Sequence, residues 1–485
     1  MSTPPPVNPK RILRFLALLA LLAAGAALAQ SDERLPAPVA RVLKAAGVPG
    51  SAVALLVQDV DARMPRANYN ADRPMNPASV MKLVTTYAGL ELLGPAYAWK
   101  TEAYASGPLR DGVLDGDLVL KGYGDPRLGY EQFWLLLRQL RAKGLREIRG
   151  DLVLDRSHFT AVAHDPARFD NEPLRPYTVG PDALLLNFKS VRLDFLPDAA
   201  AKSVAVGVEP APAQFEVINL LKLAEGPCPG LWHEGLRMDL AHTAAAARLI
   251  LTGSYPAACG EKSRHVAALD HPQYVAGVFR QLWGELGGRL AGGLREGGVP
   301  AGARLLARAD SPSLAEVVRE INKHSNNVMA RQLYLTLGAE ATGRPARAED
   351  AEAAIRSWLG RKALPMPELV IENGAGLSRA ERISADSLAR LLAAAWASPV
   401  MPEFIASLPL AGVDGTMKKR ANGSGVAGQA HVKSGYLDGV RALAGYVLDR
   451  RGKRVIVVFL ANHPNAAATR AAQDALLACA WERSC

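Results

Sequence analysis

The sequence has few of the residues that build metal and redox sites. It contains 4 cysteines and 9 histidines in 485 residues, with no Cys-x-x-Cys pair and no His-Glu-x-x-His pattern, the spacings typical of zinc sites. It also lacks a Gly-x-x-x-x-Gly-Lys-[Ser/Thr] phosphate loop, and its nearest Gly-x-Ser-x-Gly elbow, at residues 376–380, ends in alanine. No internal repeat with a period of about 20–50 residues is present, which excludes solenoids and propellers. We therefore expect neither a metal nor a cofactor.

Aromatic residues are scarce, at 6%, and no tract of one charge occurs. The 57 Lys+Arg outnumber the 47 Asp+Glu, and the net charge of +10 is spread along the chain. This balance fits attraction to acidic polymers, but no nucleic-acid partner is expected. Hydrophobic residues make up 49% of the chain, which excludes a wholly disordered or fibrous protein. The length predicts two to four domains.

One long apolar run stands at the N-terminus, at residues 15–24, after basic residues at positions 10, 11 and 14. The sequence Ala27-Leu28-Ala29 follows, a small-x-small pattern that signal peptidase reads. An uncleaved anchor is the alternative, but the run is shorter than the ~20 residues of a spanning helix. We predict that residues 1–29 are a signal peptide. The mature protein would be exported to the periplasm or cell-wall compartment, without a stable membrane span.

The four cysteines agree with export, because disulfides persist in oxidising compartments. They allow three pairings, among which sequence alone cannot choose. We favour Cys228–Cys259 and Cys479–Cys485, since each pair is local in the chain.

The predicted elements change character twice along the chain. A helix, a strand and a second helix are predicted within residues 36–93, and short strands between Gly, Pro and Asp turns over about 96–267. Helices return over 268–400, one of them continuous from Leu314 to Leu337, and a hairpin and a helix follow over 440–480. The order predicts an α+β catalytic domain interrupted by a β-rich module.

The first candidate site is Ser79-Val80-Met81-Lys82, near the start of a predicted helix. A serine three residues before a lysine lies one turn from it on the same helix face. A serine hydroxyl needs an adjacent base to become a nucleophile, and an amine in an apolar pocket has a pKa low enough to serve. A helix-capping serine beside a surface lysine is the alternative.

The second candidate site is Ser325-Asn326-Asn327, inside the long predicted helix. The hydroxyl of Ser325 can relay a proton, and the amide of Asn327 can bind a substrate carbonyl. A polar helix end is the alternative.

The third is Lys433-Ser434-Gly435, at the start of a predicted strand. A cation, a hydroxyl and a glycine on an edge strand suit an extended peptide that ends in a carboxylate. The glycine lets the backbone approach closely. A surface turn is the alternative.

In this order, the three sites match the Ser-x-x-Lys, Ser-x-Asn and Lys-Thr-Gly set of penicillin-recognising enzymes. A long strand-rich stretch separates the first from the second. The sequence therefore resembles the class C low-molecular-mass penicillin-binding proteins of the D-Ala-D-Ala carboxypeptidase/endopeptidase type. Further stretches that resemble the family lie at residues 122–126, 372–379, 410–417 and 442–446.

The resemblance implies an α+β fold with a penicillin-binding-protein/β-lactamase-like transpeptidase domain, in which helices flank an antiparallel sheet, and with β-rich inserted domains. The catalytic domain would comprise residues 31–95 and 268–485. Inserted domain II would comprise residues 96–186 and 246–267, and inserted domain III residues 187–245.

The resemblance also implies a site. Ser79 would be acylated, Lys82 would act as the base, Ser325 would relay a proton and Asn327 would hold the substrate backbone. The residues expected to bind substrate are Lys433, Ser434, Gly435, Tyr436, Arg379, Asp155 and Asp438. The implied partners are peptidoglycan stem peptides and β-lactams, while the oligomeric state is left open.

Two departures from the family pattern bear on substrate preference. Ser434 stands where threonine is commoner, and Tyr436 and Asp438 stand where small or neutral side chains are commoner. We predict that Asp155 and Asp438 accept a side-chain amine of the stem peptide. The alternatives are that Asp155 caps a turn and Asp438 faces solvent. For the whole chain, the alternatives are a β-lactamase-like hydrolase and a catalytically silent peptidoglycan-binding protein.

Overall fold

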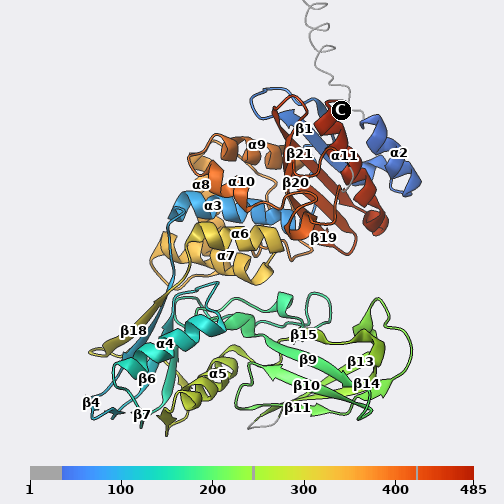
Figure 1. Ribbon diagram of the computed structural model, residues 1–485. Helices are drawn as coiled ribbons and strands as arrows, with labels where there is room; N and C mark the ends of the chain where they lie inside the picture. Colours follow the sequence, from blue (N-terminus) through green and yellow to red (C-terminus); the bar gives the residue numbers. More distant parts are fainter. Residues whose placement is uncertain (1–34, 243–245, 422–423) are drawn as a thin grey trace, which may run out of the picture.

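The structure, a computed structural model, describes residues 35–242, 246–421 and 424–485. The predicted signal peptide, residues 1–29, lies outside the described residues. Within the described residues, none of the helices is both long and apolar enough to cross a membrane. The molecule has two lobes (Figure 1), one built from both ends of the chain and one from its middle.

A five-stranded antiparallel sheet lies at one side of the upper lobe, with strand order β19-β20-β21-β1-β2. Strands β1 and β2 come from the first hundred residues and the other three from the last sixty, so distant segments share one sheet. Within the described part of the chain, residues 96–267 supply no strand to it. The bounds are β1 Val53–Asp59, β2 Ala67–Tyr69, β19 Ala430–Leu437, β20 Val440–Leu448 and β21 Arg454–Asn462.

Both faces of this sheet are covered, which explains why its strands are almost wholly apolar. Successive side chains of a strand point to opposite faces. Leu55 and its like-facing neighbours pack with the terminal helices α2 (Ala37–Ala45) and α11 (Arg470–Glu482). Leu56 faces the other way, into a helical layer. The main helices of that layer are α3 Lys82–Leu93, α6 Leu314–His324, α7 Asn327–Thr342, α8 Ala348–Arg361, α9 Ala385–Trp396 and α10 Met401–Ser407.

The continuous helix predicted from Leu314 to Leu337 is wrong. The chain breaks at Ser325, whose φ of 56° lies in the left-handed region and ends α6. Asn326 then caps α7, with its side-chain oxygen accepting from the amide of Met329 at 3.0 Å. The apolar periodicity continues through the break, so it could not reveal it. The break takes Ser325 out of the regular helix and makes Asn327 the first residue of α7.

The lower lobe contains two modules. The first has a five-stranded sheet, β17-β8-β6-β3-β18, and a small four-stranded sheet, β16-β7-β5-β4. Helices α4 (Tyr130–Ala142) and α5 (His271–Glu285) pack their apolar faces against the same core. The strands are β3 Lys100–Ala105, β4 Leu109–Arg110, β5 Val113–Leu114, β6 Leu118–Gly122, β7 Glu147–Ile148, β8 Leu152–Asp155, β16 Arg289–Leu290, β17 Leu294–Glu296 and β18 Arg304–Asp310.

The second module has two smaller sheets. One has the order β10-β9-β15, and in the other β14 pairs with β11, β12 and β13. The strands are β9 Val191–Asp198, β10 Ser203–Glu209, β11 Phe215–Asn219, β12 Lys222–Ala224, β13 Leu236–His242, β14 Ala247–Pro256 and β15 Lys262–Val266. Disulfides join Cys228 to Cys259 and Cys479 to Cys485, which confirms the local pairing.

Two of the predicted domain boundaries are wrong. Residues 246–267, assigned to inserted domain II, pair instead with β9, β11, β12 and β13 of the second module. The stretch from α5 to β18, assigned to the catalytic domain after residue 268, belongs to the first module, where β16, β17 and β18 pair with β7, β8 and β3. Strand partners that far apart in sequence leave no local signal.

The cap at the helix break gives a test of the fold. We expect Asn326→Ala to lower the free energy of unfolding of the upper lobe by about 0.5–2 kcal/mol, because the amide of Met329 loses its acceptor. Asn326→Asp keeps that acceptor and should lose little. Calorimetric unfolding of both variants measures the difference, and equal losses would contradict a capping role.

Candidate active site

Ser79 lies in the short helix η2 (Ala78–Met81), which leads directly into α3. The residue before it, Ala78, has a φ of 46°, a conformation that costs a non-glycine residue about 1–3 kcal/mol. Gly376 makes room for it: a Cβ there would lie 1.9 Å from the carbonyl oxygen of Ala78. The segment that carries Ser79 is therefore held from outside, by a loop nearly three hundred residues away in sequence.

Lys82 is fully buried one turn after Ser79. Its Nζ lies 2.9 Å from the Oγ of Ser79 and 2.7 Å from the Oδ1 of Asn327, and it also contacts the carbonyl oxygen of Ala375. An ammonium group has three protons to donate, and these three oxygens accept them. In the neutral amine, two protons satisfy Asn327 and Ala375, and the lone pair is left facing the hydroxyl of Ser79. That arrangement suits a general base.

The surroundings favour the neutral amine. Burial lowers the pKa of Lys82 well below its usual value, the positive charge of Lys433 lowers it further, and Arg331 adds a smaller effect of the same sign. The buried carboxyl group of Glu381 opposes them and raises this pKa. Burial with few compensating charges is the arrangement that activates a lysine as a base.

Lys433 links the second site to the third. It is fully buried, and its Nζ donates to the Oγ of Ser325 at 2.8 Å and to the carbonyl oxygen of Ser434 at 2.9 Å. Burial lowers the pKa of Lys433 to about 7. The left-handed turn at Ser325 brings its hydroxyl to this lysine. These contacts bring together side chains from three parts of the chain: Ser79 and Lys82 from η2 and α3, Ser325 and Asn327 from the junction of α6 and α7, and Lys433 from β19.

Strand β19 is an edge strand and runs past Pro77 and Ala78, which precede Ser79. A Cβ at Gly435 would lie 2.5 Å from the carbonyl oxygen of Pro77, so only glycine permits this approach. The hydroxyl of Ser434 lies 2.9 Å from that of Thr416, which extends the row of polar groups along the strand. Tyr436 follows, 63% exposed, with Arg441 stacked 3.7 Å from the centre of its ring.

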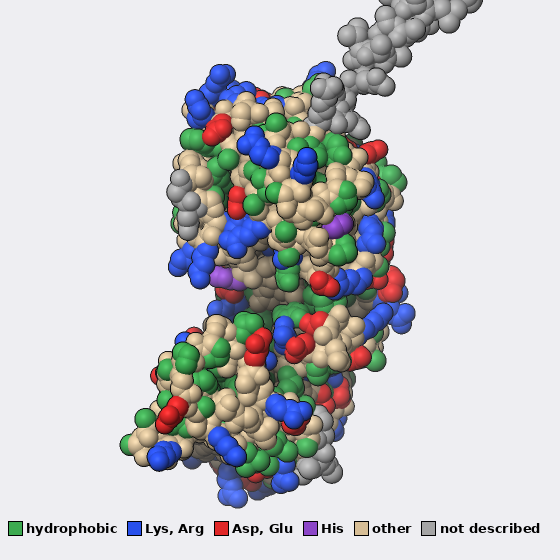
Figure 2. Space-filling view, turned by 90° about the vertical axis from the view of Figure 1, so that its right-hand side faces the viewer, with side chains coloured by type: hydrophobic (Ala, Val, Ile, Leu, Met, Phe, Trp, Pro, Cys, Tyr) green, Lys and Arg blue, Asp and Glu red, His purple; other side chains and the backbone are tan. Residues whose placement is uncertain are grey.

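The lower lobe closes one side of the cleft. Phe169 and Tyr177, from the middle of the chain, pack against Leu377 and Leu437 of the catalytic lobe. The carbonyl oxygen of Tyr177 also lies 3.4 Å from the amide nitrogen of Asn327. Figure 2 shows a hollow between the two lobes on this side of the molecule.

The comparisons with known proteins agree with this geometry. The family model "D-Ala-D-Ala carboxypeptidase 3 (S13) family" matches residues 35–482. A D-alanyl-D-alanine carboxypeptidase of Actinomadura sp. (strain R39) is 28% identical over 98% of this chain and 93% of its own length. The crystal structure of penicillin binding protein 4 from Haemophilus influenzae superimposes with a TM-score of 0.76 at 22% identity, over 90% of this chain and 98% of the other. Its complex with a β-lactam gives a TM-score of 0.71 at 22% identity, over 89% and 97%.

The chain belongs to the D-Ala-D-Ala carboxypeptidase S13 family. This confirms the resemblance, the α+β penicillin-binding-protein fold and the reaction class, which is that of a serine-type D-Ala-D-Ala carboxypeptidase.

The structure does not support Asp155 as an acceptor for a substrate amine in this S13 carboxypeptidase. Its side chain is only 2% exposed. One oxygen accepts from the amide and hydroxyl of Ser157, and the other accepts from the amide of Val299 and lies 3.4 Å from the Nζ of Lys121. The turn-capping alternative is the correct one, because both oxygens already have partners.

Asp438 and Arg379 lie at the rim of the cleft. Asp438 is exposed, and the guanidinium of Arg379 donates to its backbone carbonyl oxygen at 2.6 Å. The same guanidinium lies 5.2 Å from the ring centre of Phe169. Arg379 therefore bridges the two lobes, and the carboxylate of Asp438 remains open to solvent.

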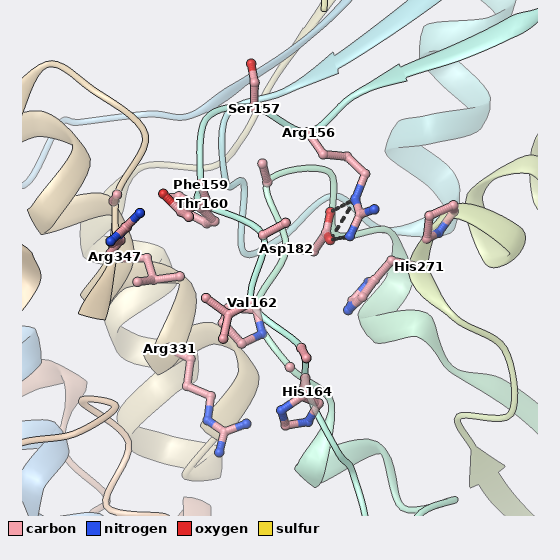
Figure 3. A pocket seen from close by; sticks show the side chains of 18 of the residues that line it. Arg156, Ser157, Phe159, Thr160, Val162, His164, Asp182, His271, Arg331 and Arg347 are labelled. Carbon is pink, nitrogen blue, oxygen red and sulfur yellow. Dashed lines mark hydrogen bonds and ion pairs between the residues drawn. The ribbon is translucent and has the colours of Figure 1, made fainter. Parts of the chain in front are cut away.

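A separate pocket of about 810 Å³ lies behind this site, between α7 and the segment of residues 154–166. Figure 3 shows Arg331, one turn after Asn327 on α7, pointing into it toward His164, while Arg156 is paired with Asp182. Arg331 donates to the carbonyl oxygen of Val179 at 3.3 Å, and its Nε has no hydrogen-bond partner among the described residues. The pocket does not include Ser79 or Lys433.

Sequence reasoning missed three groups at the site. Thr416 and Ala375 lie in stretches that it did single out, at residues 410–417 and 372–379, but nothing local marked their contacts. Glu381 lies outside those stretches and is fully buried beside them. In the described part of the chain, no cluster of three or more His, Cys, Asp or Glu could hold a metal ion.

The contact between Gly376 and Ala78 gives a test of the site. We expect Gly376→Ala to slow acylation by a β-lactam about 10–100-fold, because the new methyl group displaces the segment that carries Ser79. Gly343→Ala is the matched control: its φ of 66° is also left-handed, but no atom lies within 4 Å of the added Cβ. The measurement is the acylation rate of both folded variants, and similar rates would contradict the role of Gly376.

Proposed function

We propose that this S13 carboxypeptidase acts on peptidoglycan stem peptides through an acyl-enzyme on Ser79. The observation that carries the proposal is the contact between Ser79 and the buried amine of Lys82, 2.9 Å apart. A buried lysine with a lowered pKa can take the proton of a serine hydroxyl, whereas a solvated lysine cannot at neutral pH.

In the first half of the reaction, Lys82 takes the proton of Ser79 while the Oγ attacks the carbonyl carbon of the penultimate D-alanine. The backbone amides of Ser79 and Tyr436 would hold the oxyanion. Support comes from the close passage of Gly435 over Pro77, which places the two segments side by side. The peptide bond then breaks as the proton held by Lys82 passes through the hydroxyl of Ser325 to the departing amine of the terminal D-alanine, which leaves Lys82 neutral again.

In the second half, water attacks the ester on Ser79. Lys82 accepts a proton from that water, the ester C–O bond breaks, and Lys82 returns the proton to the Oγ of Ser79 as the shortened peptide leaves as a carboxylic acid. Asn327 would hold the substrate backbone with the amide that also orients Lys82. The same centre would cleave a cross-link where the leaving amine belongs to a second peptide. Neither half of the reaction uses a cofactor.

The terminal carboxylate of the substrate would lie along β19. Lys433 supplies the charge, and Ser434 with Thr416 supplies hydroxyl groups. We further propose that Tyr436, Arg379 and Asp438 contact the rest of the stem peptide at the rim, where Asp438 offers a free carboxylate to a side-chain amine. A β-lactam presents a carboxylate and an acyl carbonyl in the same way, so it would acylate Ser79.

The location is proposed from the sequence and the disulfides. The predicted signal peptide directs the chain out of the cytoplasm, and two disulfides are typical of an oxidising compartment. The substrate of the family lies in the same compartment. We therefore place the mature protein in the periplasm or cell-wall compartment.

The nucleophile is tested by mass spectrometry. The protein should gain the mass of one β-lactam on the peptide that contains Ser79, and Ser79→Ala should abolish labelling. Lys82→Ala should slow acylation about 10²–10⁴-fold, the usual loss for a general base. Labelling of another serine would contradict the proposal. Labelling without turnover of D-Ala-D-Ala peptides would favour a silent binding protein, and rapid release of hydrolysed β-lactam would favour a β-lactamase-like hydrolase.

The carboxylate site is tested by pH dependence. The pKa of Lys433 is lowered to about 7, so its positive charge is present below that pH and is lost as the pH rises through it. We expect KM for a peptide with a free terminal carboxylate to rise as the pH increases above about 7. The same peptide with a C-terminal amide should show no such rise. Parallel KM profiles for the two peptides would show that Lys433 does not hold the carboxylate.

A further inference from the structure

Glu381 is a buried acid that the proposed reaction does not use. Its side chain is completely buried, in the segment between α8 and α9. Its Oε1 accepts hydrogen bonds from the backbone amides of Glu372 and Asn373, both at 3.2 Å. Its Oε2 is buried and has no hydrogen-bond partner among the described residues. A buried carboxyl oxygen without a partner is costly, so it calls for an explanation.

Glu381 holds a loop of the site in place. The two amides that Glu381 binds begin the loop of residues 372–376, which forms one wall of the nucleophile site. Within this loop the carbonyl oxygen of Ala375 accepts from Lys82, that of Gly374 accepts from Thr85 at 2.7 Å, and Gly376 packs on Ala78. By holding the start of the loop, Glu381 fixes one of the two acceptors that aim the lone pair of Lys82 at Ser79.

The second effect of Glu381 is electrostatic. Two cationic side chains act on the proposed base Lys82: Lys433 on β19 and Arg331 on α7. Glu381 is the acid that acts against them on Lys82. Two other titratable groups face Glu381, namely Glu372 on its own loop and Tyr334 on α7. Within the described residues, Glu381 makes no ion pair at contact distance, so its charge acts on the cluster as a whole.

We propose that Glu381 is a positioning residue for Lys82, which it orients through the loop of residues 372–376 and whose proton affinity it sets with its charge. The inference depends on the proposed role of Lys82 as the base. Burial raises the pKa of Glu381 to about 7, so the charge is partly present at neutral pH. The sign is fixed: a negative charge near Lys82 favours the ammonium form, and its removal favours the neutral base.

The decisive variant is Glu381→Gln, which keeps an oxygen for the amides of Glu372 and Asn373 but removes the charge. We expect the acidic limb of the pH profile for β-lactam acylation to move down by roughly one pH unit. One unit below the wild-type midpoint, the variant should then reach about five times the wild-type fraction of its plateau rate. Arg331→Gln removes a charge of the opposite sign, so the acidic limb of its pH profile should move to higher pH. The double variant should return toward the wild-type midpoint.

Glu368→Gln is the matched control. Glu368 is a carboxyl on the same stretch between α8 and α9, partly buried rather than completely buried, and it accepts from the hydroxyl of Ser384. The acidic limb of the pH profile of Glu368→Gln should keep the wild-type midpoint.

Each outcome separates the two levels of the argument. If the wild type is not acylated at Ser79, the proposed function fails. If it is acylated but Glu381→Gln leaves the limb unchanged or moves it up, the inference about Glu381 alone is overturned. A Glu381→Gln protein that does not fold also overturns it, because the amide retains both backbone contacts and the role would then be one of stability. A downward shift with an unchanged midpoint of thermal unfolding supports it.

Discussion

The burial of one amine governs the arrangement of this active site. Lys82 gives up its hydration and must find three acceptors inside the protein, and they come from Ser79, Asn327 and Ala375. A buried amine without hydrogen-bond partners would be costly, so these three segments are constrained to meet. The same loss of water lowers the pKa of Lys82, which favours the neutral amine that its proposed role as a base requires. Stability and reactivity therefore depend on one set of contacts.

The cleft is completed by parts of the fold that do not carry the chemistry. The left-handed Ala78 is held by Gly376, and the edge strand β19 reaches the nucleophile only because Gly435 has no side chain. On the open side, Phe169 and Tyr177 reach over from the inserted lobe. The site thus gains a second wall from a segment that is distant in sequence.

Much of the fold followed from local patterns. The alternation in residues 50–59 predicted a strand and the apolar runs after residue 440 predicted a hairpin, and the structure has these strands in one sheet. The local patterns did not predict the helix break at Ser325, nor the return of β16–β18 to the lower lobe. The first is a single left-handed residue within an unbroken apolar period, and the second depends on strand pairs more than a hundred residues apart. Neither leaves a signal within a window of neighbouring residues.

The sequence by itself determined the chemical groups: a serine one helical turn before a lysine, a Ser-x-Asn and a Lys-Ser-Gly, in the order of the S13 family. Residue type and spacing suffice to mark these groups, because each motif is local in the chain, although the geometry of the Ser-x-Asn motif depends on the break at Ser325. Only the tertiary structure decided that Asp155 is satisfied internally while Asp438 is open, and that Glu381 lies buried beside the base. Burial and charge surroundings are produced by segments hundreds of residues apart, and they set a side chain's pKa and availability, which no motif encodes.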